Sequence, residues 1–432
     1  MHALHKSEKI EHDGERTHYG IKKVARSFEL MKKIPPRRIL FITWDGPHTS
    51  YLEGLFLPIF IRLKAFGLEP HVLQFSWGEE RVHNERATLC EAAGVPYRYV
   101  PIWRSGGGAG PFLTAWLGAR HIRRTVLDWK IDTLLPRSLM PALAVLRLSQ
   151  SERSTLSLVF DADGLAADEK VDFERLSPHS LVYRVLRDIE AEMLRVADTV
   201  LCRTEAAKGI LQARAGAGVK QTKYHVVSNG KNPEPYARAL QERKPRHTDR
   251  FRLCYCGSIG EKYRLPEMIE LSLFLKRSIP NLTFDLYTPA IAEVRNEIER
   301  RGLVGEEWIS WRSLPAEDVP IELVECDLGV AMLQSPFSMR AVQAIKVSEY
   351  LMAGVPVVGT PSIGDSRLLI EEGVFRSAEK EDREQTLRWI LDQVIPKRDR
   401  MREVCHEIGR KYFSVKQTAD RYVEALKFSM DS

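Results

Sequence analysis

Short apolar runs that alternate with amphipathic helical patterns are the feature that most constrains the fold of this chain. The first run, Arg38 to Trp44, lies between a charged cluster and the turn sequence Asp45-Gly46-Pro47. An apolar run of this length fits a strand that is buried on both faces. Similar runs follow at 71–75, 97–101, 133–135, 156–160 and 199–202, with helical patterns between them. This alternation predicts an α/β fold with a parallel sheet covered by helices on both faces.

The same pattern restarts in the second half of the chain. After a short run at 224–227, a stretch rich in Pro, Lys and Arg, 231–250, predicts a linker. Beyond it, predicted strands at 251–256, 283–287, 328–332 and 355–358 alternate with predicted helices at 266–277, 290–301 and 342–353. Two Rossmann-like domains would face each other across a cleft at the carboxyl ends of their strands, where such folds bind ligands.

The length of 432 residues agrees with two domains of about 150–200 residues each. We predict a charged N-terminal appendage at 1–37, a first Rossmann-like domain at 38–235, a second at 236–413, and a closing helix at 414–432.

Composition excludes several classes of protein. Hydrophobic residues make up 44% and charged residues 28%, which argues against global disorder and against a fibrous repeat. No apolar run reaches the roughly 18–20 residues of a membrane span. The six cysteines lack paired CxxC spacing, and the N-terminus has no apolar core of a secretory signal. These features predict a cytoplasmic protein with reduced thiols, and the net charge of +6 indicates a mild preference for anionic partners.

The most specific motif runs from Lys346 to Val358, with the sequence KVSEYLMAGVPVV. Lys346 and Glu349 would share one helix face near the start of a helix that Gly354 ends. A cation beside helix amides binds phosphate, and a carboxylate one turn later can accept hydrogen bonds from ribose hydroxyls. The pair therefore predicts a nucleoside-diphosphate site. From the spacing alone, an ordinary helical ion pair before a tight turn fits equally well.

Further segments occur with this motif in a fixed order from Arg38 onward. They are Asp45-Gly46-Pro47, Arg137-Ser138, Phe160 to Gly164, Glu190 to Ala206, Val226 to Gly230, Tyr255 to Ser258 and Tyr412-Phe-Ser414. Together they resemble the retaining glycosyltransferases of the glycogen-synthase-like family, glycosyltransferase family 4, which have the GT-B fold and include bacterial polysaccharide and lipopolysaccharide enzymes.

The resemblance implies a donor site in the second domain. It places Lys346 on the diphosphate, Glu349 on the ribose, and the Gly257-Ser258 backbone against the phosphates of a UDP- or GDP-sugar. It also implies a catalytic role for Lys346, a saccharide or lipid-linked acceptor, no cofactor besides the donor substrate, and a closing helix that packs back toward the first domain.

Two departures from the family pattern affect the site. The family often has a glutamate eight residues before Glu349, but Ala341 occupies that position. A variant within the family has a Ser/Phe/Ser loop instead, which Ser335, Phe337 and Ser338 match, so Ser338 is a donor-binding candidate. The basic residue that usually follows the Gly-Ser loop is not cleanly matched, and Lys262 and Arg264 are the candidates, of which we select Lys262.

The first domain contributes candidates from its loops. Gly46 permits a close turn after the first strand, and His48 just beyond it would face the cleft as a catalytic or donor-contacting group; a solvated imidazole is the alternative. Arg137 follows another strand and would face the same cleft, unless it is an ordinary surface arginine.

Asp161 and Asp163 form a D-x-D sequence, which holds a divalent metal in another glycosyltransferase architecture. The phosphate-binding signals lie in the other half of the chain, and a lysine with helix amides can neutralise a leaving diphosphate. We therefore expect these aspartates, with Arg137, on the acceptor side of the cleft and expect no metal.

The span from Trp103 to Lys130 combines aromatic and basic residues and contains one acid, Asp128. It predicts either an amphipathic helix on an anionic membrane surface near a lipid-linked acceptor, or a core helix with a solvated basic face. Nucleic-acid binding is not expected, because the chain has no recognisable binding module.

The sequence thus predicts a glycosyltransferase that moves a sugar from a nucleotide donor with retention of configuration, in bacterial surface polysaccharide synthesis at the inner face of the cytoplasmic membrane. A hydrolysing sugar-nucleotide epimerase of the same architecture and a non-catalytic binding protein are the alternatives.

Overall fold

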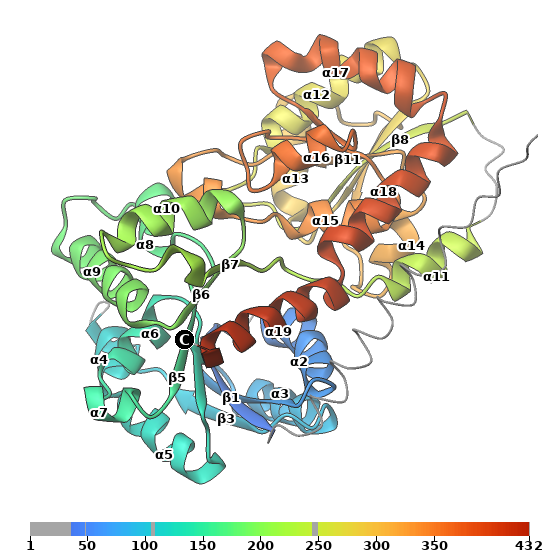
Figure 1. Cartoon of the computed structure of the whole chain (residues 1–432). Coiled ribbons are helices and arrows are strands. Elements are labelled where there is room, and N and C mark those ends of the chain that lie inside the picture. The colour runs from blue at the N-terminus through green and yellow to red at the C-terminus, as the bar shows by residue number, and fades with distance from the viewer. Residues whose placement is uncertain (1–35, 48, 105–108, 244–248, 432) are drawn as a thin grey trace, which may run out of the picture.

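The computed structural model describes residues 36–47, 49–104, 109–243 and 249–431. These residues form two α/β domains, each with a parallel sheet flanked by helices (Figure 1). The doubly wound α/β architecture predicted from the alternating runs is confirmed.

The described residues of the first domain contain a seven-stranded sheet in the order β3-β2-β1-β4-β5-β6-β7. The strands are β1 (Arg37–Trp44), β2 (Leu68–Ser76), β3 (Tyr97–Pro101), β4 (Thr133–Pro136), β5 (Ser157–Asp161), β6 (Thr199–Cys202) and β7 (Tyr224–Val226). The helices are α2 (Leu57–Lys64), α3 (Glu80–Ala92), α4 (Ala109–Leu117), α5 (Ala119–Trp129), α6 (Leu139–Leu146), α7 (Gln150–Arg153), α8 (Ala166–Phe173), α9 (Leu181–Val196) and α10 (Glu205–Ala215).

The described residues of the second domain contain a six-stranded sheet in the order β10-β9-β8-β11-β12-β13. Its strands are β8 (Phe251–Cys256), β9 (Leu282–Tyr287), β10 (Ile309–Arg312), β11 (Leu328–Ala331), β12 (Val357–Gly359) and β13 (Phe375–Ser377). The remaining helices are α11 (Glu234–Glu242), α12 (Leu265–Ser278), α13 (Ile291–Arg300), α14 (Val319–Leu323), α15 (Ile345–Met352), α16 (Ser366–Glu371), α17 (Arg383–Trp389), α18 (Arg398–Phe413) and α19 (Val415–Asp431).

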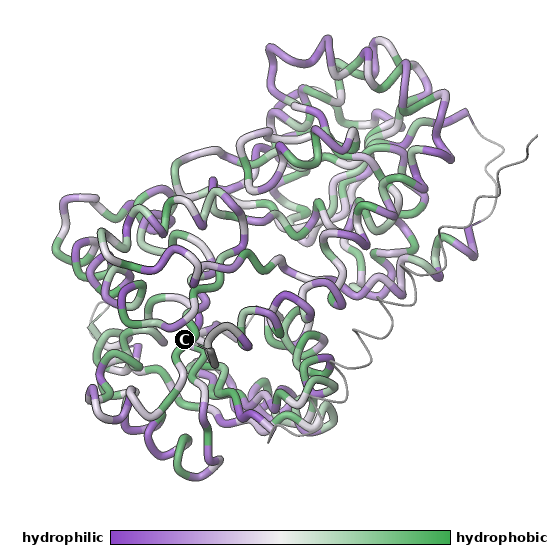
Figure 2. The backbone as a smooth tube through the Cα atoms, viewed as in Figure 1, coloured by the Kyte–Doolittle hydropathy of each residue, from purple (hydrophilic) through white to green (hydrophobic). Residues whose placement is uncertain are grey.

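The central strand of each sheet follows the apolar pattern of the sequence. In β1, Ile39, Leu40, Phe41 and Ile42 are all buried, and the strand pairs in parallel with β2 and β4. Strand β8 is likewise buried and pairs with β9 and β11. Figure 2 shows hydrophobic residues gathered in the interior of each domain. The apolar runs form the sheet centres because both faces of these strands are covered by helices.

Three segments differ from the predicted elements. The expected helix at 342–353 starts at Ile345 as α15, and a 3-10 turn, Phe337–Ala341, precedes it. The basic and aromatic span divides into α4 and α5. The predicted linker contains α11, which begins with prolines that a first helical turn tolerates, and whose Tyr236 and Ala239 are buried against the second domain. The predicted domain boundaries stay predictions.

The C-terminal helix α19 crosses back and packs beside α2 of the first domain (Figure 1). Its Tyr422 and Leu426 are buried in the same cluster as Phe41. Where the chain crosses between the domains, the two connections pair with each other: the Lys231 amide donates to Phe413, and the Val415 amide donates to Lys231. None of the helices in the described ranges is both long and apolar enough to cross a membrane.

Candidate functional site

Lys346 lies in the first turn of α15, beside the loop that follows β8. Its side chain is buried, and its ammonium donates a hydrogen bond to the Tyr255 hydroxyl at 2.7 Å. The same ammonium lies 4.1 Å from the ring centre of Tyr255 and 3.9 Å from that of Tyr263. No ion pair joins it to a carboxylate of the described residues. Burial lowers the pKa of Lys346 to about 7, although Cys256 and Glu349 act to raise it.

The loop after β8 brings backbone close to this ammonium. Gly257 has a φ of 137°, a conformation that favours glycine, and a Cβ at this position would lie 3.4 Å from the Lys346 Nζ. Tyr255 also donates its hydroxyl to the Ser258 carbonyl, which holds the loop against the lysine. The structure therefore brings together three of the predicted donor-binding residues, Lys346, Gly257 and Ser258.

Glu349 lies one turn after Lys346 and lines a cavity of about 630 Å³ between the domains. The cavity is also lined by Gly257 and Ser258, by Ser50 and Gly54 of the first domain, and by Tyr287, Thr288, Pro289, Leu314, Ala316, Val319 and Pro320. Glu349 forms an ion pair at 2.8 Å with Lys231, which the first crossing of the chain places at the same cavity. The ordinary helical ion pair between Lys346 and Glu349 that the spacing left open is absent from the described contacts.

Lys262 and Ser338 of the second domain each contact the first domain. The Lys262 ammonium lies 2.6 Å from a carboxylate oxygen of Glu169, and the Ser338 amide donates to Asp172 at 2.9 Å. Both carboxylates belong to α8 of the first domain. The Ser338 hydroxyl is buried and lacks a hydrogen-bond partner among the described residues. Their predicted role in donor binding stays a prediction.

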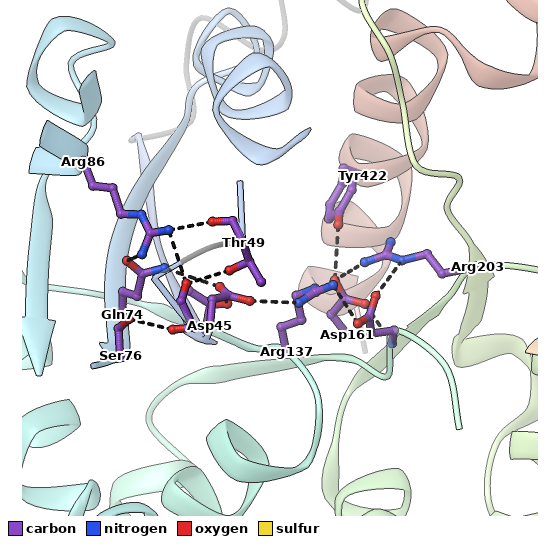
Figure 3. A network of polar contacts seen from close by, with 12 residues as sticks. Asp45, Thr49, Gln74, Ser76, Arg86, Arg137, Asp161, Arg203 and Tyr422 are labelled. Atoms are coloured by element: carbon purple, nitrogen blue, oxygen red, sulfur yellow. Dashed lines mark hydrogen bonds and ion pairs between the residues drawn. The ribbon is translucent and has the colours of Figure 1, made fainter. Parts of the chain in front are cut away.

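Arg137, Asp161 and Asp163 meet at the carboxyl ends of β4 and β5. Figure 3 shows Arg137 and Asp161 within a network of polar contacts. Arg137 bridges Asp163 at 2.6 Å and Asp45 at 3.6 Å. Asp161 is fully buried and pairs with Arg203, while the Tyr422 hydroxyl of α19 approaches it at 3.5 Å. These side chains therefore bond mainly to one another.

Electrostatics separate the two aspartates. Burial raises the pKa of Asp161, and the nearby Asp163 carboxylate adds to this effect, against the opposing charge of Arg203. Burial also acts to raise the pKa of Asp163, but the guanidinium groups of Arg137 and Arg203 outweigh it, and the net shift is downward. Asp163 is thus held as a carboxylate, which has no proton to donate as a general acid. Its lowered pKa also makes it a weak general base.

The loop after β1 packs beside this network. Gly46 packs against the Trp77 ring, and its carbonyl accepts hydrogen bonds from Thr49 and Arg86. The Tyr51 ring lies 5.1 Å from the Arg137 guanidinium carbon. Burial raises the pKa of Tyr51. The Asp163 carboxylate of the first domain raises it further, and the Lys262 ammonium of the second domain acts to lower it. His48 lies outside the described residues.

Sequence reasoning missed four residues of this site: Lys231, Tyr51, Tyr255 and Tyr263. Tyr255 belongs to a predicted strand and to a segment that carries the family resemblance, but no role was predicted for its side chain. Lys231 belongs to the stretch predicted as a linker. The described residues contain no group of three or more His, Cys, Asp or Glu that could hold a metal ion. The absence of a metal requirement stays a prediction.

Comparisons with known proteins give a likeness of structure. No family model matches the chain, and no curated protein matches its sequence. Similar solved structures include HepE of Anabaena in complex with UDP-glucose, with 16% identity and a TM-score of 0.64 over 90% of this chain and 99% of that one.

Two further structures resemble the chain to a comparable degree. A glycosyltransferase from Rickettsia africae has 11% identity and a TM-score of 0.65, over 92% of this chain and 99% of that one. A putative UDP-N-acetylglucosamine 2-epimerase from Listeria monocytogenes has 15% identity and a TM-score of 0.58, over 91% of this chain and 97% of that one. At these identities the likeness shows the fold alone, and it confirms the predicted GT-B arrangement of two Rossmann-like domains.

Proposed function

We propose that the protein is a glycosyltransferase that uses a nucleoside-diphosphate sugar, a UDP- or GDP-sugar, as its donor. The observation that carries the proposal is the Lys346 ammonium, which is buried beside the Gly257 backbone without a carboxylate partner in the described contacts. A desolvated cation at the end of a strand is suited to bind the diphosphate of such a donor. The likeness to HepE, whose structure contains UDP-glucose, supports the same assignment.

The cavity beside Lys346 has parts that suit each portion of the donor. Glu349 can accept hydrogen bonds from the ribose, and Lys231 orients its carboxylate. The Leu314, Val319 and Pro320 side chains give an apolar surface of the kind that a nucleobase packs on. Amides of the Gly257–Ser258 loop would lie along the phosphates.

In the proposed reaction, Lys346 stabilises the charge that develops on the departing diphosphate while an acceptor hydroxyl attacks the anomeric carbon. Retention of configuration, a reaction without a metal, and a role in bacterial surface polysaccharide synthesis at the inner membrane face rest on the resemblance to family 4 glycosyltransferases. Under this scheme the acceptor is a saccharide or a lipid-linked saccharide.

Replacement of Lys346 by alanine should lower turnover by about 10²–10³-fold, the usual effect of removing one group that stabilises transition-state charge. Calorimetry with UDP, GDP and ADP first identifies the base, and sugar transfer is then measured with the matching donors. Lys411→Ala serves as the control, because this exposed lysine pairs with Glu372 on the surface. Near-normal turnover of Lys346→Ala would remove the basis of the proposal.

The likeness to the Listeria epimerase favours a second candidate, a hydrolysing sugar-nucleotide epimerase of the same architecture. Such an enzyme should release free nucleotide from the donor sugar without any added acceptor, whereas a transferase needs the acceptor for rapid release. A non-catalytic binding protein remains the third candidate, because Ala341 stands where the family often has a glutamate. It would bind nucleotide without turnover in either assay.

A further inference from the structure

The first domain contains a groove of about 610 Å³ that is separate from the donor cavity. It lies at the carboxyl ends of β1 and β4, between α4, α6, α8 and α9. The residues that line it are Trp44, Trp77, Ile102, Pro111, Phe112, Ser138, Leu139, Met140, Pro141, Ala166, Leu176, Val182 and Leu186, with Arg104, Lys170, Glu174 and Arg175. Its volume is in the range of small-molecule sites.

The lining combines an aromatic and aliphatic surface with an excess of positive charge. Glu174, the acidic residue of the lining, forms an ion pair with Lys170 at 2.6 Å, so its charge is already neutralised. Arg104 lies over the Trp77 ring at 4.8 Å, and neither Arg104 nor Arg175 forms an ion pair with a carboxylate in the described part of the chain. The groove therefore offers two free guanidinium groups next to an apolar surface, which suits a ligand with a hydrocarbon part and an anionic part.

Apolar side chains are also exposed on two of the helices that flank the groove. On α4, Leu113, Trp116 and Leu117 are exposed, with Trp116 at 50%. On α9, Leu181, Val182 and Val185 are exposed, with Leu181 at 69%. Exposed apolar residues around a pocket mark an interaction surface. A long hydrocarbon chain leaving the groove would lie against these two helices.

Helix α8 connects the groove to the proposed reaction centre. Its Ala166 and Lys170 line the groove, while its Glu169 pairs across the domain interface with Lys262. Tyr263, the next residue, packs on the Lys346 ammonium. The groove and the donor lysine are thus linked by a chain of contacts that runs through α8, the Glu169–Lys262 pair and Tyr263.

We propose that this groove binds the lipid part of the acceptor, an anionic amphiphile of the alkyl or prenyl phosphate class, and that the reacting hydroxyl belongs to a saccharide linked to it. The hydrocarbon chain lies on Trp44, Phe112 and Met140, and the phosphate is bound by Arg104 and Arg175. The name acceptor rests on the proposed function, whereas binding of the amphiphile does not. Of the residues predicted for the acceptor side, Arg137 pairs with Asp163, and Asp161 pairs with Arg203. Their role on the acceptor side stays a prediction.

The test measures binding of dodecyl phosphate to the full chain below its micelle concentration, by calorimetry and by quenching of tryptophan fluorescence. Dodecyl maltoside and inorganic phosphate are the probes for the chain alone and the anion alone. We expect dodecyl phosphate to bind at least about tenfold more tightly than either, because it alone engages both parts of the groove.

Variants locate the site. Arg104→Gln combined with Arg175→Asn removes the charges, and asparagine tolerates the positive φ of 58° at position 175. Met140→Trp fills the groove. Both should weaken dodecyl phosphate binding about tenfold or more, whereas Arg120→Gln, an exposed charge change on α5 outside the groove, should leave it unchanged. Urea unfolding of every variant checks that each one is folded, whether or not the protein binds nucleotide.

Several results would overturn the proposal that the groove binds an anionic amphiphile. One is failure of the wild-type chain to bind dodecyl phosphate, and another is equally tight binding of dodecyl maltoside or of inorganic phosphate. The others are an equal loss of binding in Arg120→Gln and unchanged binding in a folded Met140→Trp variant. Binding to phosphatidylcholine vesicles that contain phosphatidic acid gives a further test. If Met140→Trp does not reduce this binding, the protein contacts lipid only through its surface, and the proposal is wrong. If dodecyl phosphate binds but no nucleotide does, the proposed function fails and the groove stands.

Discussion

Lys346 and Arg203 are both buried cations, but their surroundings give them different roles. Arg203 pairs with Asp161 and donates to the Val227 carbonyl at 3.2 Å, so its charge is compensated within the first domain. Lys346 contacts two tyrosine rings and one phenol hydroxyl, and its pKa is lowered to about 7. An arginine whose charge is neutralised by an aspartate serves the structure of its domain. A buried cation without a carboxylate partner is available to bind an anionic ligand.

This difference predicts a pH dependence of nucleotide binding. A bound diphosphate stabilises the protonated lysine and raises its pKa, so binding takes up a proton wherever the free protein has lost it. Below pH 7 the titration of Lys346 should cause little change in the affinity for UDP, because the lysine is already mostly protonated there. Above pH 7 the affinity should fall by up to about tenfold per pH unit, until the pH reaches the raised pKa of the complex.

Calorimetry between pH 6 and 9 measures this fall, and the enthalpy in buffers of different ionisation enthalpy reports the proton uptake. Lys346→Arg is the matched control, because an arginine stays charged throughout this range. Persistence of the same fall in Lys346→Arg would assign it to another group.

At the scale of elements, the position of the donor residues depends on how α15 packs against α18. Gly409 of α18 lies at the crossing, where an added Cβ would come within 2.7 Å of the Met352 amide nitrogen. His406, one turn earlier, contacts the Met352 carbonyl at 2.6 Å. The glycine thus allows two backbones to approach closely, and this fixes the helix that carries Lys346 and Glu349.

Gly409→Ala should therefore lower the free energy of unfolding by about 1–3 kcal/mol, as overpacking does, and weaken UDP binding by displacing α15. Gly209→Ala is the matched control, since Gly209 also lies within a helix but nothing lies within 4 Å of its added Cβ. There the same substitution should stabilise the protein by about 0.5–1 kcal/mol. Urea unfolding measures both. Equal effects at the two glycines would contradict the close helix approach.

At the scale of the whole molecule, the C-terminal helix completes the first domain. Helix α19 buries Tyr422 and Leu426 against the first sheet, and the Ser228 and Thr418 hydroxyl groups lie 3.0 Å apart near the crossings between the domains. The chain therefore passes twice between the domains, and the core of the first domain stays incomplete until the last residues are added.

Leu426→Ala should destabilise the first domain by about 2–5 kcal/mol, the usual cost of truncating a fully buried leucine. Leu391→Ala, at a leucine of the second domain with 40% exposure, is the control and should cost less than about 1 kcal/mol. Urea unfolding combined with limited proteolysis shows which domain opens first. Preferential opening of the second domain in Leu426→Ala would contradict this role of α19.

Much of the fold could be predicted because it depends on local patterns. The run from Arg38 to Trp44 can be buried only as an interior strand, and Lys346, Glu349 and Gly354 occupy fixed positions on one helix and its end. Helices and strands depend on hydrogen bonds and side-chain periodicity among residues that are close in the sequence. The sequence alone therefore specifies where these elements form.

Contacts between distant segments could not be predicted in this way. Nothing in the local pattern separates Lys231, which reaches Glu349, from the other basic residues of its stretch, or shows that Tyr255 and Tyr263 enclose Lys346. Likewise, nothing in the local pattern shows that Arg137 binds Asp163 or that Arg203 binds Asp161. The sequence by itself determined two α/β domains and the helix that carries the donor motif. Only the tertiary structure decided which charges are compensated and which remain free, because charge compensation depends on which distant groups are brought within a few ångströms of one another.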